Sequence, residues 1–274
     1  MTLTASLFRI LLLLLLTTVL LLLGCQSRLI YYPRPYDEAY REMLREHQGV
    51  ALKYHTAQGS QTAHYIPARK PGKQPQIWLC FGGNGTVALD WLSYLSTWNP
   101  EFAYLLVDYP GYGDCKGSPT PGRIRESSRA AFAALANHLN QPEEKLQPHL
   151  GVLAHSIGCA AGLMAANDLG VQKLVLVAPF TTMTDMGKRV LGWPLCYVNL
   201  HRFDNRKQLA DAVKRGARVE IFHGTADEII PVTMSRELAG PYPQQVKLHE
   251  AEGWDHNDIL RGLSAKIGAA MAGL

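Results

Sequence analysis

The sequence contains few charged residues and no concentrated positive charge. Only 18% of its 274 residues are Asp, Glu, Lys or Arg, and the formal net charge is +4. Lys and Arg are scattered, without a run of five and without interleaved aromatic residues. A nucleic-acid-binding surface normally needs basic side chains concentrated on one face, so we expect no nucleic-acid partner. An anionic membrane surface remains compatible with this charge.

Cysteines are also scarce, and none has the spacing of a metal site. The chain has five cysteines, and no Cys/His cluster has the short spacing of zinc ligands, so we expect neither metal nor cofactor. Cys80 and Cys159 stand in apolar surroundings and are predicted to be buried thiols. Cys115 and Cys196 lie in loop-like surroundings and are candidates for a disulfide, although the sequence leaves the pairing open.

The one long apolar run is short for a membrane-spanning helix. Residues 10–23 are interrupted only by Thr17 and Thr18 and lead into Gly24 and Cys25. A spanning helix needs about 20 apolar residues, so this run suits the hydrophobic part of a signal peptide better. Residues 22–25 resemble the lipobox of bacterial lipoproteins, in which the cysteine becomes the lipidated first residue. We therefore predict a lipoprotein signal peptide over residues 1–24, cleaved before Cys25. An uncleaved anchor is the alternative.

The residues after Cys25 predict where the protein lies. Gln26, in place of aspartate, resembles the pattern of lipoproteins sent to the outer membrane. We thus expect a bacterial cell-envelope protein, lipid-anchored and facing the periplasm, with the membrane as a partner through its N-terminal lipid. Residues 25–49 are a membrane-proximal segment without a long flexible tether, and residues 50–274 form a single domain.

Apolar strands alternate with helices along that domain. An antiparallel hairpin over residues 50–66 precedes buried strands at 76–81, 102–108, 150–154, 173–178, 218–223 and 246–249. Helices are predicted at 89–98, 121–140, from 158 onward, 232–239 and 259–270. This alternation predicts an α/β fold with a mostly parallel central sheet and helices on both faces. Residues 181–204 are less regular and form a short cap segment.

A serine stands at the apex of a predicted strand–turn–helix. Residues 151–154 form the strand, 155–157 the turn, and the helix begins at Gly158. Such a turn strains the backbone of Ser156, lifts its Oγ clear of the sheet and points the first helix amides at whatever the oxygen attacks. Ala154 occupies the position where glycine is usual in this motif.

Other reactive groups follow other strands. A glycine-rich turn at 82–85 could receive an oxyanion on its amides, Asp227 follows the strand at 218–223, and His256 follows the last strand. Functional loops of parallel sheets gather at the carboxyl ends of the strands, so these groups and Ser156 are expected to meet. Taken singly, each has a structural interpretation, as a turn residue or a loop glycine. The competitors are His223 and His249 as the base and Asp108, Asp185 and Asp204 as the acid.

These motifs together resemble the α/β-hydrolase superfamily, and within it the membrane-associated serine hydrolases that include protein depalmitoylases and their bacterial relatives. The resemblance covers residues 77–258 and rests on FGGNG at 81–85, DYPGYG at 108–113, AHSIG at 154–158, APF at 178–180, HGTADEIIP at 223–231 and DHND at 255–258. It implies the α/β-hydrolase fold, with Ser156 as nucleophile, Asp227 as acid and His256 as base. It further implies an oxyanion hole formed by the amides of Asn84 and Ile157. Gly82 departs from the pattern, which commonly has histidine there.

We therefore expect a membrane-anchored serine hydrolase that cleaves carboxylic esters or thioesters of fatty acyl groups through an acyl-enzyme, with lipids or acylated proteins as substrates. A serine peptidase of the same fold is the first alternative. A non-catalytic envelope lipoprotein that uses the fold for binding is the second. The cap segment supplies apolar residues that would either close the core or line an acyl site: Phe180, Met183, Met186, Val190, Leu191, Trp193, Leu195, Tyr197, Val198 and Leu200.

Overall fold

The computed structural model describes residues 2–70, 72 and 75–274, except for the side chains of residues 2–5, 15, 19, 21–23, 25 and 29. Its centre is an eight-stranded sheet in the order β1-β2-β4-β3-β5-β6-β7-β8. The strands are β1 (Val50–Thr56), β2 (Gly59–Ile66), β3 (Ile77–Phe81), β4 (Ala103–Val107), β5 (Leu150–His155), β6 (Lys173–Val177), β7 (Arg218–Gly224) and β8 (Val246–Ala251). β2 pairs antiparallel with both β1 and β4, and the other neighbouring strands are parallel. The predicted hairpin and mostly parallel sheet are confirmed.

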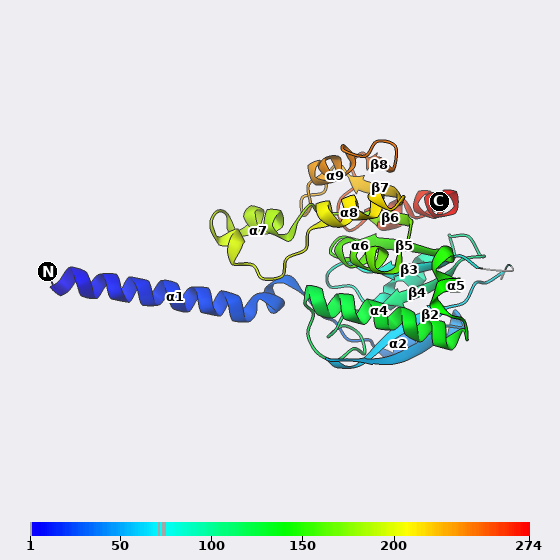
Figure 1. Ribbon diagram of the computed structural model, residues 1–274, viewed down its shortest axis with the longest axis horizontal. Coiled ribbons are helices and arrows are strands. Elements are labelled where there is room, and N and C mark those ends of the chain that lie inside the picture. Colours follow the sequence, from blue (N-terminus) through cyan, green and yellow to red (C-terminus); the bar gives the residue numbers. More distant parts are fainter. Residues whose placement is uncertain (1, 71, 73–74) are drawn as a thin grey trace.

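Helices cover both faces of the sheet (Figure 1). The helices that follow the hairpin are α3 (Leu92–Leu95), α4 (Pro121–His138), α5 (Glu143–Leu146), α6 (Gly158–Leu169), α7 (Met183–Leu191), α8 (Asn205–Lys214), α9 (Val232–Ala239), α10 (Ile259–Gly262) and α11 (Ser264–Gly273). Short 3-10 turns are η1 (Ala88–Trp91), η2 (Gln147–His149) and η3 (Leu195–Val198). The expected α/β arrangement is therefore confirmed.

Alternate residues along the strands pack into two separate cores. In β3, Ile77, Leu79 and Phe81 join the larger core, which also contains residues of α4, α6 and α8. Trp78 and Cys80 join the smaller core on the opposite face, with residues of α3, α10 and α11. A strand covered on both faces has to be apolar at every position, and all five β3 residues are buried. This burial fixes the sheet that carries the candidate site.

The helices differ from the predictions in several places. The helix expected at 89–98 is reduced to η1 and the single turn α3. α5, α7 and α8 were not predicted, and α7 lies within the segment 181–204 that was expected to be less regular. The helix expected at 259–270 is divided into α10 and α11 at Leu263. The sequence analysis missed α2 (Glu38–Glu46), which begins at Asp37, where the aspartate side chain accepts a hydrogen bond from the Tyr40 amide.

The N-terminal helix α1 (Thr2–Ile30) projects from the globular part as a single continuous helix (Figure 1). Among the described residues, no helix meets the length and hydropathy required to cross a membrane. Cys25 lies within α1, and its side chain is outside the described residues. Cleavage before Cys25 and its lipidation therefore stay predictions.

The cysteines that the structure describes are buried thiols. Cys80, Cys115, Cys159 and Cys196 are all free, so the candidate bridge between Cys115 and Cys196 is absent. Cys115 packs against β2, where its Sγ lies 3.4 Å from the Thr62 carbonyl oxygen, and burial raises the pKa of its thiol to about 12. The four buried side chains contribute to packing.

Candidate active site

The site lies where the order of the strands reverses. From β3 the chain goes to β4 on one side and later returns to β5 on the other, so β4, β3 and β5 are neighbours. Phe81 pairs with Ala154 in the parallel register of β3 and β5. The loops that leave the carboxyl ends of these two strands consequently diverge around a crevice, the usual ligand position in open α/β sheets. The 82–85 turn and Ser156 occupy that position.

Ser156 has the strained backbone that the sequence predicts. Its φ is 56°, in the left-handed region that a residue with a side chain rarely adopts. Its amide donates to the Val177 carbonyl at 2.9 Å, which ties the turn to the neighbouring strand β6. A Cβ on Gly158 would lie far inside the van der Waals contact of the Phe81 and Gly82 carbonyl oxygens. Glycine at position 158 therefore lets α6 begin directly beside the end of β3.

The structure brings Ser156, His256 and Asp227 into hydrogen-bond contact. His256 Nε2 lies 2.9 Å from Ser156 Oγ, and His256 Nδ1 lies 2.6 Å from Asp227 Oδ2. All three side chains are largely buried, although 100 residues separate the serine from the histidine. A neutral imidazole in this position can accept the hydroxyl proton, and the carboxylate can stabilise the imidazolium that results.

Asp227 is surrounded by hydrogen-bond donors. Its Oδ1 accepts from the amides of Ile229 and Ile230 at 2.9 and 2.8 Å, and its Oδ2 also lies 3.2 Å from His223 Nε2. Burial opposes the negative charge, but hydrogen bonds from His223 and His256 outweigh it and hold the pKa of Asp227 well below its usual value. The carboxyl is thus ionised throughout the neutral range.

The sequence analysis missed a role for His155, the residue before the serine. His155 Nε2 lies 3.1 Å from the backbone carbonyl of His256, and the two rings lie 5.0 Å apart. Burial, together with the positive charge that His256 can carry, lowers the pKa of His155 to about 3. His155 therefore stays neutral and donates to the backbone of the residue that contacts Ser156, which helps to fix the position of His256.

Asn84 is held by three groups from distant parts of the chain. Its side-chain oxygen accepts from Tyr112 Oη at 2.8 Å and from the Tyr32 amide at 2.9 Å, and its Nδ2 donates to the Ile30 carbonyl at 2.5 Å. Ile30 is the last residue of α1, and Tyr32 lies two residues after it. In the part of the chain that the structure describes, the backbone amides of Asn84 and Ile157 have no protein acceptor. Both amides are therefore available to an incoming oxygen.

The competing histidines are engaged elsewhere. His223 Nδ1 lies 2.6 Å from Ser235 Oγ, and its Nε2 lies 2.8 Å from the Ile230 carbonyl. His249 pairs with Glu220 and stacks on Phe222. Neither is the histidine that contacts Ser156.

The competing aspartates have structural partners. Asp204 caps α8 and accepts from the Lys207 amide. Asp185 binds Thr181, Thr182 and Arg206. Asp108 accepts hydrogen bonds from the Tyr36 hydroxyl and the Ala88 amide. Burial raises the pKa of Asp108 to about 7, although these two hydrogen bonds lower it. Asp227 is the aspartate that contacts His256.

The apolar residues expected to line an acyl site differ in exposure, and two of them, Met186 and Val198, are half-buried. Phe180 and Met183 are buried in the larger core. Six others are exposed at the surface of the cap segment: Val190, Leu191, Trp193, Leu195, Tyr197 and Leu200. An exposed side chain does not enclose an acyl chain, so these six residues need another explanation.

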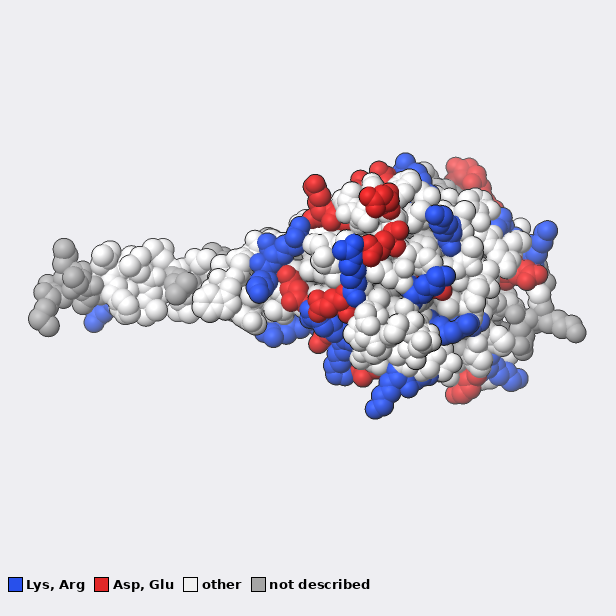
Figure 2. All heavy atoms as spheres, turned by 90° about the horizontal axis from the view of Figure 1, so that it is seen from above, with Lys and Arg blue, Asp and Glu red and all other residues white. Residues whose placement is uncertain are grey.

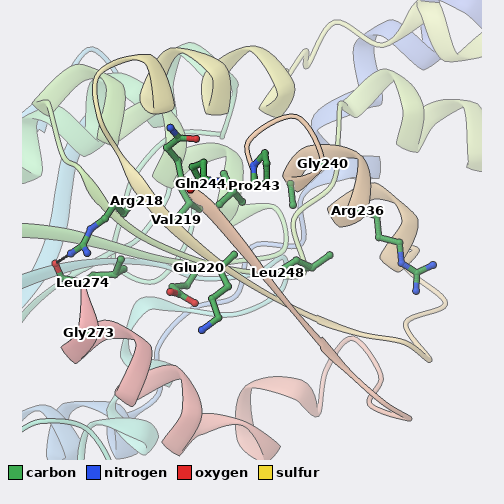
Figure 3. A pocket seen from close by; sticks show the side chains of 14 residues that line it. Arg218, Val219, Glu220, Arg236, Gly240, Pro243, Gln244, Leu248, Gly273 and Leu274 are labelled. Carbon is green, nitrogen blue, oxygen red and sulfur yellow. Dashed lines mark hydrogen bonds between the residues drawn. The ribbon is translucent and has the colours of Figure 1, made fainter.

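A hollow of about 680 Å³ lies away from Ser156, between β7, β8, α9 and the C-terminus (Figure 3). Arg218 at its edge donates to the terminal Leu274 oxygen, and Arg236 pairs with Glu250. The hollow lies at the beginning of β7, whereas Asp227 follows the end of that strand. Within the described residues, no group of three or more His, Cys, Asp or Glu side chains is arranged to hold a metal ion. The reactive groups gather only at the carboxyl edge of the sheet.

Comparison with known proteins agrees with this fold. An uncharacterized protein of Mycobacterium tuberculosis is 27% identical over 238 residues, which cover 85% of this chain and 81% of the relative. An alpha-beta hydrolase from Vibrio vulnificus superposes with a TM-score of 0.67 at 16% identity, over 86% of this chain and 88% of the other. An esterase from Pyrococcus furiosus superposes with a TM-score of 0.68 at 10% identity, over 89% and 98%. The sequence model of the alpha/beta hydrolase family matches residues 78–260, more than half of the sequence, and the chain therefore belongs to that family.

Proposed function

We propose that this protein is a serine hydrolase that cleaves carboxylic esters or thioesters of fatty acyl groups at a membrane. The observation that carries the proposal is the contact of Ser156 Oγ with His256 Nε2, and of His256 Nδ1 with Asp227, at the carboxyl edge of the sheet. Membership of the alpha/beta hydrolase family supports a hydrolytic reaction. The Pyrococcus furiosus neighbour, an esterase by name, shares the fold.

The reaction would proceed through an acyl-enzyme. His256 takes the proton of Ser156 as Oγ attacks the acyl carbonyl carbon, and Asp227 stabilises the imidazolium. Collapse of the tetrahedral intermediate breaks the bond to the alcohol or thiol, which leaves with the proton from His256. A water molecule then attacks the acyl-enzyme by the same route and releases the carboxylic acid. No other group is required for proton transfer.

The amides of Asn84 and Ile157 would form the oxyanion hole. Ile157 directly follows the serine at the beginning of α6, and Asn84 lies in the turn after β3, so the two amides approach the serine from neighbouring strands. A preorganised donor of this kind contributes roughly 3 kcal/mol to the transition state. The three hydrogen bonds to the Asn84 side chain would keep its amide in position.

Fatty acyl groups are the substrate class that the surroundings favour. The apolar N-terminal run is suited to contact with lipid, which would hold the site close to acyl substrates. Each buried methylene of an acyl chain contributes about 0.8 kcal/mol, so even partial contact would discriminate strongly against acetate. The substrates would be lipids or acylated proteins near the membrane.

The N-terminus would provide the anchor. We infer that Cys25 is lipidated after cleavage of residues 1–24, which places the domain in the bacterial cell envelope, facing the periplasm, with Gln26 favouring the outer membrane. The resemblance of residues 22–25 to a lipobox supports this placement.

The nucleophile can be tested directly. A fluorophosphonate should label the purified protein at Ser156, and Ser156→Ala should abolish labelling, as measured by peptide mass spectrometry. Asp227→Asn and His256→Ala should each lower turnover by roughly four orders of magnitude. Labelling that persists in Ser156→Ala would overturn the assignment of Ser156 as the nucleophile. A protein that is neither labelled nor active would favour a non-catalytic binding role.

Tyr112→Phe should lower kcat about tenfold and leave KM nearly unchanged, because it loosens Asn84 and affects only the oxyanion of the transition state. Burial raises the pKa of Tyr112 to about 12, so the wild-type hydroxyl is a neutral donor. Tyr54→Phe is the matched control, since it removes a buried hydroxyl bonded to Ser127 and remote from Asn84. Equal effects of the two changes would exclude a positioning role for Tyr112.

The substrate class is tested with a chain-length series of p-nitrophenyl esters and acyl thioesters beside a peptide panel. We expect kcat/KM to rise from acetate to medium chains by up to about fourfold per contacted methylene. Peptide cleavage without ester or thioester turnover would instead indicate a serine peptidase.

The anchor is tested by mass spectrometry of the protein from membranes. The mature chain should begin at Cys25 and carry acyl groups, and Cys25→Ser should release or misplace it. A chain that begins at Met1 in the membrane fraction would identify an uncleaved anchor instead.

A further inference from the structure

The surface of the cap segment concentrates exposed apolar side chains. Outside α1, the described residues include ten exposed large apolar side chains, and six of these lie within residues 190–200. Trp193 is 76% exposed and Val190 77% exposed. Water-soluble proteins rarely expose so many large apolar groups together, and such patches usually mark an interaction site. Residues 190–200 are therefore a candidate interaction site.

The charged residues within this stretch are all basic, although Asp185 and Asp204 flank it. Residues 186–203 contain Lys188, Arg189 and Arg202 and no Asp or Glu, and all three basic side chains are exposed. Arg28, near the end of α1, is also basic and exposed. In Figure 2, both basic and acidic side chains lie where the nearly uncharged rod of α1 meets the globular part. Exposed Trp and Tyr beside basic residues and aliphatic side chains suit the headgroup region of an anionic bilayer.

The cap segment is tied to the chain that leads to the N-terminal anchor. Gln26 Nε2 donates to the Val198 carbonyl at 2.8 Å, and Gln26 Oε1 accepts from the Leu200 amide at 2.7 Å. The His201 ring lies within hydrogen-bond distance of Ser27 Oγ and of Tyr31 Oη. Residues 26–31 follow Cys25, so the residues that make these contacts are retained if residues 1–24 are removed. η3 of the cap segment also contacts α1.

We propose that residues 188–202 form a cap surface that docks on an anionic phospholipid bilayer. The aliphatic and aromatic side chains enter the interface, and Lys188, Arg189 and Arg202 contact lipid phosphates. The cap segment follows the carboxyl end of β6, at the same edge of the sheet as Ser156. Docking therefore turns the edge that carries Ser156 toward the bilayer. The proposal requires no particular reaction at Ser156, so it goes beyond the proposed esterase activity.

Tryptophan quenching provides the test. The full chain is bound to vesicles of phosphatidylglycerol and brominated phosphatidylcholine, in which bromine quenches only tryptophans that contact lipid. Residues 1–30 contain no tryptophan, and Trp78, Trp91 and Trp98 are buried, so insertion of α1 alone gives no signal. We expect quenching in the wild-type protein and loss of most of it in Trp193→Phe.

Trp254→Phe is the matched control, because Trp254 is the other exposed tryptophan and lies in the loop after β8. This variant should keep the quenching of the wild-type protein. Charge reversal by Lys188→Glu with Arg189→Glu should reduce quenching on vesicles that contain phosphatidylglycerol. Ser156→Ala should quench as the wild type does, which separates this proposal from the catalytic one.

Two results would overturn the proposal. Equal quenching of the wild-type protein and Trp193→Phe would place the lipid contact elsewhere. Absence of quenching, together with a Trp193 emission shift that depends on protein concentration without lipid, would assign the cap surface to a second copy of the chain.

Discussion

The close approach of α6 to the end of β3 is the constraint on which the site depends. Only a residue without a side chain fits at position 158, because the carbonyl oxygens of Phe81 and Gly82 occupy the space of a Cβ. The approach places the Ile157 amide beside the 82–85 turn and forces Ser156 into a left-handed conformation. Strain of this kind costs roughly 1–3 kcal/mol and persists only where the surroundings fix it, here through β3, β5 and β6. The surrounding sheet is thus rigid because both of its faces are buried.

His155 and His256 lie close together at the site, but their surroundings differ. Asp227 receives two backbone amides and lies near both His223 and His256, so its negative charge is stabilised before any proton moves. His155 is neutral because burial and His256 both oppose its charge. A positive charge on His155 is therefore disfavoured, and His256 is the ring that contacts both Asp227 and Ser156.

The sheet and the three reactive side chains were predictable because they leave local patterns. Strands buried on both faces are continuous apolar runs, and groups that follow their carboxyl ends must gather at one edge. The contacts of Asn84 with Ile30 and Tyr32 leave no such pattern, because more than fifty residues separate the partners. The exposure of Trp193 could not be predicted either, since an irregular apolar segment has no repeating pattern that distinguishes its buried side from its exposed side. The role of His155 depends on a contact 101 residues away and is likewise visible only in three dimensions.

The hydrogen bonds of Asn84 to Ile30 and Tyr32 also mean that residues before the sheet contribute to the candidate site. The sheet starts at Val50, and the family match begins at residue 78, yet an amide proposed to bind the oxyanion is oriented by backbone atoms that lie before both positions. A chain shortened to residue 50 would retain the sheet and lose two of the three partners of the Asn84 side chain. Such coupling is reciprocal, so an acyl group that orders the 82–85 turn would also stabilise the residues at the base of α1. Occupancy of the site would thereby affect the end of the globular part from which α1 projects.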